Sequence, residues 1–402
     1  MSTNSQRLAL VFANAGHVLT HLLMLLYPTV VLALERRFSL SYGELMLLSL
    51  PGTVLYGAGA LPAGILGDRW SAERMMVLFY LGSGAAAIAT GCATGPLGIG
   101  IGLALVGLFG SIYHPVGIAW LVRNAENRGR ILGWNGIFGS VGVGIAPATA
   151  GLLTDWIDWR AAFILPGIVA LGMGLALAWF VRQGVVVAAK TDLKPQAEPR
   201  RGDVRRAFVA LSITMLGAGI IYQAMTVVLP KLFEQRLVGL TDGGTLGAGG
   251  FASLVFAEGM IIPLLGGWLA DRYSLKWIYV GSWMLAVPAL LATIGLFELP
   301  LFAMTMVIFS LMSLVAPTEN ALLVRYTPGR WRATAFGAKF VLSLGVSSLG
   351  VPLVAFIYDR TGDFVWLFAV LGALAVAIVL AGIFLPREGE EEGAVPAAAP
   401  AE

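Results

Sequence analysis

The segment "GILGDRWS" at residues 64–71 returns later in the chain as "GWLADRYS" at residues 267–274, an offset of 203 residues. A second segment, "HPVGIAWLVRNAENRGR" at 114–130, matches "APTENALLVRYTPGRWR" at 316–332 at an offset of 202. A third match, at an offset of 205, pairs single residues of the two halves: Pro147 with Pro352, Asp158 with Asp363 and Phe163 with Phe368. Three matches at nearly the same offset indicate that the chain consists of two copies of one unit.

The composition predicts that both copies lie in a membrane. Hydrophobic residues make up 58% of the 402 residues, charged residues only 12%, and the mean hydropathy is +0.83. A water-soluble globular protein needs a charged surface that this composition does not supply. The net charge of +3 is small and spread over many loops, which argues against nucleic-acid binding. The single cysteine, Cys92, excludes an internal disulfide.

Apolar stretches long enough to cross a bilayer as helices occur throughout the chain. A β-barrel would need strands of about ten residues with alternating polarity, whereas these stretches are continuously apolar and about twice that length. The sequence therefore predicts an all-α membrane protein with twelve transmembrane helices in two pseudo-symmetric six-helix bundles. The predicted spans are residues 8–34, 44–66, 75–93, 98–122, 131–153, 160–181, 207–233, 248–270, 277–296, 301–324, 333–357 and 364–385.

Basic residues predict the orientation of these spans. Of the 26 Lys and Arg residues, 19 fall in the loops and termini on one side and six on the other, so the richer side is expected to be cytoplasmic. Both termini are then cytoplasmic, and a multi-pass protein of the inner membrane is expected. The apolar run after "MSTNSQR" is too long for a signal-peptide core and is expected to remain as the first span.

The predicted domain boundaries follow from the same pattern of spans. Six spans per copy make the two repeats parallel, so the bundles are expected to face each other across a cavity. The predicted units are an N-terminal bundle (1–181), a cytoplasmic linker (182–206), a C-terminal bundle (207–385) and a disordered acidic tail (386–402).

The repeated loop resembles the signature between helices 2 and 3 of the major facilitator superfamily, and the resemblance extends over essentially the whole chain. Ser71 and Ser274 replace the usual glycine, and Glu73 takes a commonly basic place. An Asp near Arg on adjacent loops can form charge-assisted hydrogen bonds in only one arrangement of the bundles, which predicts a gate on the cytoplasmic side. The residues of these two gating loops are Gly64, Asp68, Arg69 and Arg74, and in the second copy Gly267, Asp271, Arg272 and Lys276.

Small residues in the fifth span resemble a signature of proton-coupled antiporters in this superfamily. Ala146 and Ala150 stand where two further glycines usually occur, and generic packing of small residues is the alternative interpretation. Close packing along this helix would seal the protein against leak and favour obligatory exchange. The residues of the antiporter-like motif are Gly133, Gly142, Pro147 and Gly151.

Two stretches of the first half are similar to the fosmidomycin-resistance type of efflux transporter. They are "YPTVVLALERRFSLSYGELMLL" at 27–48 and "GLFGSIYHPVGIA" at 107–119. The resemblance implies proton-driven export of a small solute. Many relatives have an arginine inside helix 4, but here His114 is the only basic residue between 98 and 122, so that part of the proton machinery is not carried over.

All three histidines of the chain lie inside predicted spans. His17 and His21 are four residues apart and share a helix face, and the helical rise of about 1.5 Å per residue puts them and His114 near the middle of the membrane. With a reference pKa near 6.5, histidine suits proton or substrate handling; neutral interhelical hydrogen bonds and metal ligation are the alternatives. Because the spacing alone is thin evidence for metal, the sequence predicts neither a metal nor a cofactor.

Three other ionisable side chains are expected within spans, namely Glu258, Glu319 and Lys339. Each would cost about 2.5–3.5 kcal/mol facing lipid at midbilayer, so each should face protein or water. Glu258 is the predicted protonatable carboxylate, whereas Glu319 and Lys339 lie at similar depth on consecutive helices and can form a buried pair. The polar residues expected to join the cavity lining, or to serve as packing hydrogen bonds, are Tyr113, Asn135, Tyr222 and Gln223.

Together these features predict a monomeric secondary transporter that works by alternating access. No nucleophile and base stand at a recognisable spacing, so no enzyme and no catalytic residue is expected. Its expected partners are a small-molecule substrate, protons and the lipid bilayer. Proton-coupled antiport, with export of the substrate, is the favoured function. Proton-coupled uptake and a non-transporting receptor are the alternatives.

Overall fold

The structure is a computed structural model that describes residues 3–124, 128–186, 201–241, 243–327, 339 and 341–386. Within these residues every regular element is a helix, as predicted. The first half contains α1 (Thr3–Leu25), α2 (Tyr27–Glu35), α3 (Tyr42–Leu47), α4 (Leu50–Ala58), α5 (Ala60–Arg69), α6 (Ala72–Gly91), α7 (Pro96–Gly110), η1 (Tyr113–Gly117), α8 (Ile118–Arg123), α9 (Arg128–Trp156) and α10 (Ala161–Arg182). The second half contains α11 (Arg201–Arg236), α12 (Val238–Thr241), α13 (Thr245–Ala257), η2 (Glu258–Met260), α14 (Ile262–Ala270), α15 (Leu275–Ala292), η3 (Thr293–Gly295), α16 (Glu298–Tyr326), η5 (Val341–Gly345), η6 (Val346–Leu349), α18 (Gly350–Thr361) and α19 (Val365–Ile383).

The number of membrane-spanning helices agrees with the prediction. Among the described residues, 11 helices are long and apolar enough to cross a bilayer, and a twelfth is obtained when two segments bent by 41°, Tyr42–Ala58 and Ala60–Arg69, count as one span. The break falls at Gly59, where a Cβ would clash with Ser111 and with the backbone of Leu55. The bend in the second predicted span therefore lies where the chain packs tightly against Ser111, the residue that follows α7.

Part of the predicted linker is helical. Helix α10 ends at Arg182 and α11 begins at Arg201, so residues 201–206, which the sequence places in the linker, are helical. The rest of the predicted linker at 187–200, the predicted tail from 387 and the end of the second repeated segment, including Arg332, lie outside the described residues.

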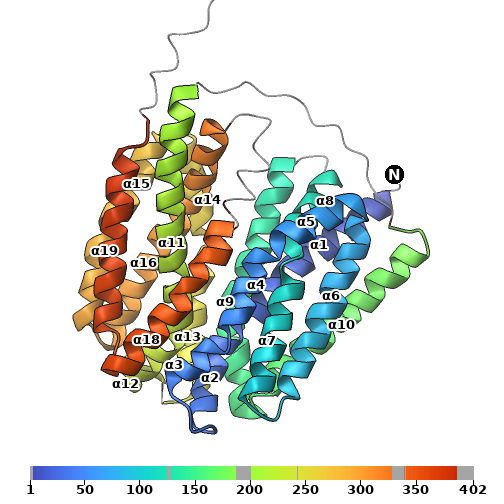
Figure 1. Cartoon of the computed structure of the whole chain (residues 1–402), viewed down its shortest axis with the longest axis horizontal. Helices are drawn as coiled ribbons and strands as arrows, with labels where there is room; N and C mark the ends of the chain where they lie inside the picture. Colours follow the sequence, from blue (N-terminus) through green and yellow to red (C-terminus); the bar gives the residue numbers. More distant parts are fainter. Residues whose placement is uncertain are drawn as a thin grey trace, which may run out of the picture.

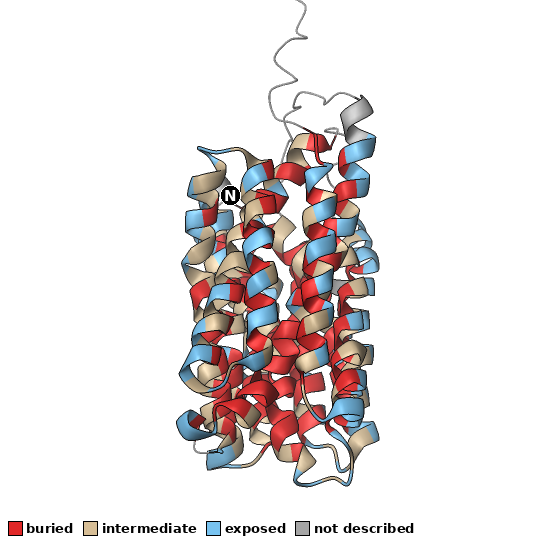
Figure 2. Ribbon diagram, turned by 90° about the vertical axis from the view of Figure 1, so that its left-hand side faces the viewer, coloured by how far each residue is buried: buried red, intermediate tan, exposed pale blue. Residues whose placement is uncertain are grey.

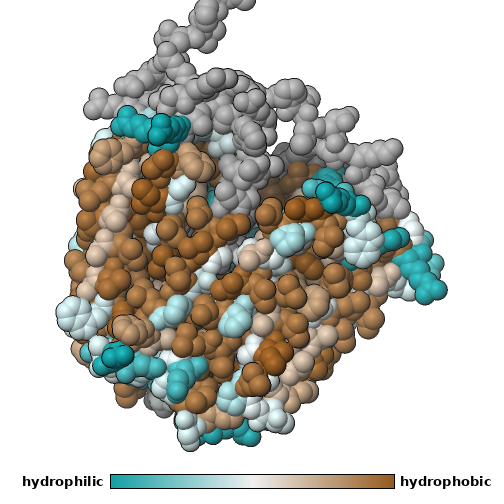
Figure 3. Space-filling view, viewed as in Figure 1, coloured by the Kyte–Doolittle hydropathy of each residue, from teal (hydrophilic) through white to brown (hydrophobic). Residues whose placement is uncertain are grey.

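The two halves stand side by side, with α11 and α19 of the second half nearly upright and α6 and α10 of the first half slanting away from them (Figure 1). Buried residues lie along the interior and are densest toward the end opposite the N-terminus (Figure 2). On the face drawn in Figure 3, apolar side chains form a broad middle band and hydrophilic side chains gather at its two ends. An apolar surface of this kind is expected of a protein surrounded by lipid.

The halves meet mainly at one end, which we call the distal end and define by Glu35, Lys231 and Asp359. There α9 packs along α13, α3 packs on α18, α2 packs on α11 and α4 packs on η5. At the proximal end, which carries the N-terminus, the main contacts of α5 are with η1 and α6, and those of α14 are with α16 and η2. Each of these proximal helices therefore packs chiefly within its own half.

Candidate functional site

His114 lies on an irregular turn of helix. Residues Tyr113–Gly117 form a π-helix, η1, between α7 and α8. Pro115 has no N–H group to continue an α-helical ladder, so a wider turn is a natural accommodation at this point. Single π turns inside longer helices occur frequently at functional sites.

The structure brings the three histidines together. The ring centroids of His17 and His21 lie 5.1 Å apart, and the His114 ring lies 5.4 Å and 5.3 Å from those two rings. One ring nitrogen of each histidine lies within 4.8 Å of the corresponding nitrogens of the others. His17 is buried, whereas His21 and His114 are partly exposed. We call this group the histidine cluster.

A hydrogen-bond network fixes the base of the histidine cluster. The Nδ1–H group of His17 donates to the backbone carbonyl of Asn135 on α9, at 2.7 Å. The Asn135 side chain donates to Asn14 and to the hydroxyl of Tyr113, both at 2.9 Å. Tyr113, whose ring stacks on His17 at 4.8 Å, donates to the carbonyl of Ala13. The predicted residues Tyr113 and Asn135 thus position the cluster and connect α1, η1 and α9.

Glu258 lies at the seam between the halves, apart from the histidine cluster in the sequence. It follows the last residue of α13 and begins η2, and it is 9% exposed. Its Oε2 accepts a hydrogen bond from Ser310 at 2.6 Å, while Oε1 has no hydrogen-bond partner among the described residues. The next residue, Gly259, accepts a hydrogen bond from Ser140 of the first half, at 2.7 Å.

Glu319 and Lys339 form an ion pair. The Lys339 Nζ lies 2.7 Å from Glu319 Oε1, and the two side chains are 13% and 11% exposed. Lys339 also donates to Asn320 at 2.6 Å, and Tyr279 donates to the other Glu319 oxygen at 3.2 Å. The pair is therefore embedded in hydrogen bonds, as a buried ion pair requires.

The antiporter-like motif lies along α9, which runs unbroken through Pro147. A Cβ at Gly142 would meet the backbone carbonyl of Val18 on α1, and a Cβ at Gly151 would lie 2.7 Å from the backbone of Leu246 on α13. At Gly133 no atom in the described part of the chain lies within 4 Å of the position of a Cβ. Two of the three motif glycines therefore mark close helix contacts, one within the half and one across the seam.

The two gating loops differ in their contacts. Asp68 forms an ion pair with Arg123 at 3.2 Å, and the Arg74 guanidinium lies 6.0 Å from the Trp70 ring. Arg272 lies over Trp268 at 4.4 Å, and Lys276 donates to backbone carbonyls at the end of α19. Of the remaining residues of the predicted loops, Gly64 lies against Pro115, Arg69 ends α5 and Asp271 follows the last residue of α14. Gly267 has no neighbour of its Cβ position within 4 Å in the part of the chain that the structure describes.

Tyr222 and Gln223 lie on α11, away from the histidine cluster in the sequence. Tyr222 is 41% exposed and packs edge-on against Phe309 at 6.2 Å. Gln223 lines a small cavity together with first-half residues such as Leu23 and Gly52. Both therefore occupy the C-terminal half, and Gln223 lies beside the seam.

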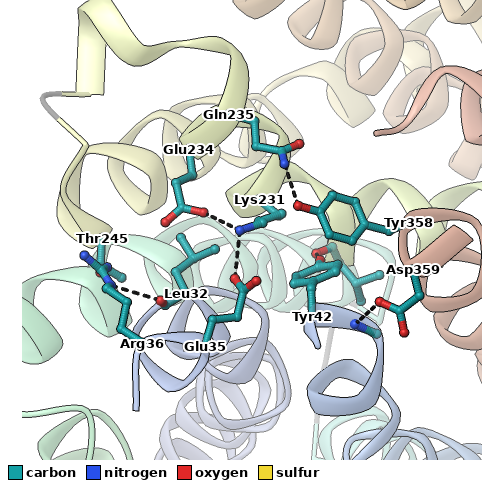
Figure 4. Close-up of polar contacts among 12 residues, drawn as sticks. Leu32, Glu35, Arg36, Tyr42, Lys231, Glu234, Gln235, Thr245, Tyr358 and Asp359 are labelled. Carbon is teal, nitrogen blue, oxygen red and sulfur yellow. Dashed lines mark hydrogen bonds and ion pairs between the residues drawn. The ribbon is translucent and has the colours of Figure 1, made fainter. Parts of the chain in front are cut away.

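A charged cluster at the distal end is not predicted by the sequence (Figure 4). Lys231 of α11 lies 2.8 Å from Glu35 of α2 and 2.7 Å from Glu234, and its Nζ lies over the rings of Tyr42 and Tyr358. Further bonds join the halves around it: Arg36 with Thr245, and Asp359 with Ser41 and Gly43. The sequence shows only that Lys231, Glu35 and Glu234 lie near the ends of predicted spans. It does not show which helix faces they occupy or that α2 packs on α11, so it does not predict that they pair.

Comparisons with known proteins agree with this architecture. A family model described as "Major Facilitator Superfamily" matches residues 15–262 and 253–401. A puromycin resistance protein of Streptomyces alboniger is 29% identical over 30% of this chain and 24% of its own length, so this chain spans about a quarter of that relative. A probable sulfoacetate transporter of Cupriavidus necator is 24% identical over 82% of each chain. The structure of a bacterial homologue of the human lysosomal transporter Spinster, inward-facing and unoccupied, superposes with a TM-score of 0.73 at 16% identity, covering 96% of this chain and 95% of that one.

Proposed function

Because this chain belongs to the Major Facilitator Superfamily, whose model matches nearly its whole length, it is a membrane transporter for small molecules and not an enzyme, and we propose that it is a proton-coupled antiporter. In this proposal it works as a monomer in the inner membrane, with both termini in the cytoplasm, and exports its substrate. The count of basic residues by loop supports that orientation.

The observation that carries the proposal is the seam between the two halves. Contacts across it run from Asp155, which accepts from the Leu246 N–H, to Ser140, which donates to Gly259. Beyond Ser140, toward the proximal end, no atom of the described residues lies within 4 Å of the position of a Cβ at Gly136 or Gly133. A seam that is closed at one end and loose at the other is expected of one state of an alternating-access cycle. With the proposed orientation, this state opens toward the cytoplasm.

Proton coupling is assigned to Glu258. Its carboxyl is nearly buried and, among the described residues, receives one hydrogen bond, from Ser310. It lies one residue from Gly259, which accepts the Ser140 bond at the end of the closed seam. A buried carboxylate is stable only when water or a cation compensates its charge, so its protonation is coupled to which side of the membrane it faces. Protonation from outside and release to the cytoplasm would then drive the exchange.

Two further observations support export as the direction of transport. The close packing of Gly142 and Gly151 on α9 supports a leak-free exchanger, and the first half is similar to fosmidomycin-type exporters. One relative is a puromycin resistance protein, whereas another is a probable sulfoacetate transporter. Puromycin and sulfoacetate are therefore the first two compounds to test in opposite directions of the proton gradient.

The decisive test is flux into proteoliposomes under an imposed pH gradient. An antiporter accumulates the compound when the lumen is acidic, whereas accumulation driven by an acidic exterior would contradict antiport. Glu258→Gln is expected to abolish the dependence on the gradient while retaining exchange of labelled for unlabelled compound. Glu44→Gln is the matched control, because this exposed carboxyl belongs to the capping box of α3, which glutamine preserves.

A further inference from the structure

We propose that His17, His21 and His114 form a binding site for one divalent transition-metal ion of the Zn²⁺ type. The inference is independent of the proposed proton coupling. It rests on the geometry of the histidine cluster, on the hydrogen bond that orients His17, and on the chemistry of a set of three imidazoles.

The geometry brings three ligand atoms near a common point. His17 and His21 stand four residues apart on α1, the spacing at which two histidines on one helix face can hold the same ion. His114 comes from η1, so the third ligand is on a second element and the site is a triangle instead of a line. The three nitrogens lie within 4.8 Å, whereas tetrahedral Zn–N bonds of about 2.0–2.1 Å require about 3.4 Å between nitrogens. Binding an ion therefore requires the three nitrogens to approach one another by about 1.4 Å.

The second requirement is that a ligating histidine presents a lone pair. The Nδ1–H of His17 donates to the Asn135 carbonyl at 2.7 Å, which selects the tautomer in which Nε2 is unprotonated. Metal-bound histidines almost always have such a partner on the other nitrogen. The His17 ring is also clamped, with Tyr113 stacked on one side at 4.8 Å and Gly139 against its edge, where a Cβ would lie 2.6 Å from Nε2.

The ligand set leaves room for a further group. Three neutral imidazoles match the ligand set of catalytic zinc sites, in which the fourth position holds water or substrate. No Asp, Glu or Cys joins this cluster among the described residues, so the positive charge of the ion is not balanced by the protein. A hydroxide or another anion is therefore expected as the fourth ligand. Both ring nitrogens of His114 are buried, so an ion at this site would lie inside the protein, away from bulk water.

The chain offers a clean test, because it contains only three histidines and one cysteine. Full-length protein is purified in detergent with a tag free of histidine and is stripped with a chelator. Titration with Co²⁺ is followed by its visible absorption, and Zn²⁺ is then added as a competitor. We expect one ion per chain and bands typical of nitrogen coordination. Replacing His17, His21 or His114 by Ala should weaken the affinity by about tenfold or more.

Matched variants separate binding at the histidines from binding at the cysteine thiol or at Glu258. Cys92→Ser removes the exposed thiol and should leave binding unchanged. Glu258→Gln should also bind metal as the parent does, so a failure of proton coupling and a failure of the metal site are distinguishable. If the variant that lacks all three histidines binds Co²⁺ as tightly as the parent, or if Cys92→Ser abolishes binding, the proposal is overturned.

A measurement on the unmodified protein covers the case in which histidine variants do not fold. Protein labelled with ¹⁵N only in histidine gives ring signals from three residues alone. Stoichiometric Zn²⁺ is expected to shift all three sets, with His17 retaining the signal of a protonated Nδ1. Signals that stay in place at a one-to-one ratio would mean that the cluster is only a hydrogen-bonded packing contact.

Discussion

At the scale of the residue, the main energetic problem is the placement of charge in an apolar protein. Lys339 and Glu319 illustrate the solution, because each is nearly buried and each has the other as its partner at 2.7 Å. Asn320 and Tyr279 supply further hydrogen bonds. Such a buried ion pair often stabilises the fold no more than two apolar residues would in its place. A single charge left there without its partner destabilises the fold strongly.

This asymmetry predicts the outcome of a double-mutant cycle. Glu319→Gln and Lys339→Met, made separately, should each destabilise the protein by about 3 kcal/mol, because each leaves one buried charge without its partner. The double variant should recover most of that loss. Thermal unfolding in detergent measures the stability of the parent, the two single variants and the double variant. Single losses that simply add in the double variant would show that the two side chains are not coupled.

The residue scale also shows how far sequence alone can predict the site. The four-residue spacing of His17 and His21 predicts a shared face, and counting from helix ends predicts the middle depth of all three histidines. The closure of the triangle depends on the π turn at Tyr113–Gly117 and on the rotation of η1 against α1. Neither is encoded in a local pattern, because both result from packing between helices distant in the sequence.

At the scale of the element, α9 is the helix that joins the site to the seam. Its residues contact α1 at Gly142, bind His17 through the Asn135 carbonyl and meet α13 at Gly151. Glycine is required where backbones approach this closely, whereas in an open position it only weakens the helix.

Two alanine substitutions on α9 should therefore have different effects on stability. In Gly142→Ala the new methyl group meets the Val18 carbonyl, and since backbone cannot move aside like a side chain, we expect a loss of about 1–3 kcal/mol. In Gly136→Ala the new methyl group has no neighbour within 4 Å among the described residues, so the variant should be neutral or more stable by about 0.5–1 kcal/mol through helix propensity. Melting temperatures in detergent test the pair, and equal shifts for both would contradict the packing argument.

The contact between α2 and α11 predicts how the distal end is held closed. Lys231→Met removes the ion pair with Glu35, which joins the halves, and the pair with Glu234 within α11. Each is a charge-assisted hydrogen bond worth about 1.5–3 kcal/mol, and its loss leaves the Glu35 and Glu234 carboxylates near each other without the lysine. Opening of this end should become at least about tenfold more frequent.

The opening can be measured by the reactivity of a buried cysteine. Thr29→Cys on α2, fully buried here, is placed in a Cys92→Ser background and treated with a membrane-impermeant maleimide. Lys231→Met should accelerate the labelling. Arg160→Met is the control, because the pair of Arg160 with Asp158 lies within one half and should not affect the seam. Equal acceleration by both variants would point to general loosening of the fold.

At the scale of the whole molecule, the sequence predicts the architecture better than it predicts the contacts. The repeat at an offset near 203 and the apolar runs are sufficient for two bundles of six helices, because bilayer thickness fixes helix length and internal symmetry fixes the pairing of spans. The Lys231 cluster and the extent of the closed seam are not predictable, since they depend on which of several bundle arrangements the chain adopts.

The repeat also provides symmetric positions for observing the alternation between states. Trp70 and Tyr273 are equivalent in the two halves, lie at the proximal end and are 54% and 60% exposed. Leu97 and Leu299 are equivalent at the distal end and are 77% and 62% exposed. Spin labels on cysteines at each pair, in a Cys92→Ser background, report the width of the two ends by pulsed electron paramagnetic resonance.

If the halves rock about the seam, the two pairs must change in opposite directions. Adding a transported compound, or lowering the pH to protonate Glu258, should shorten the distance between positions 70 and 273 and lengthen that between 97 and 299. Labels at 70 and 97, both in the first half, serve as the control and should not move, because each bundle turns as a rigid body. If the distances at both ends increase or decrease together, or if the distance of the control pair changes, the bundles expand or deform and do not rotate as rigid bodies. Alternating access about this seam would then be wrong.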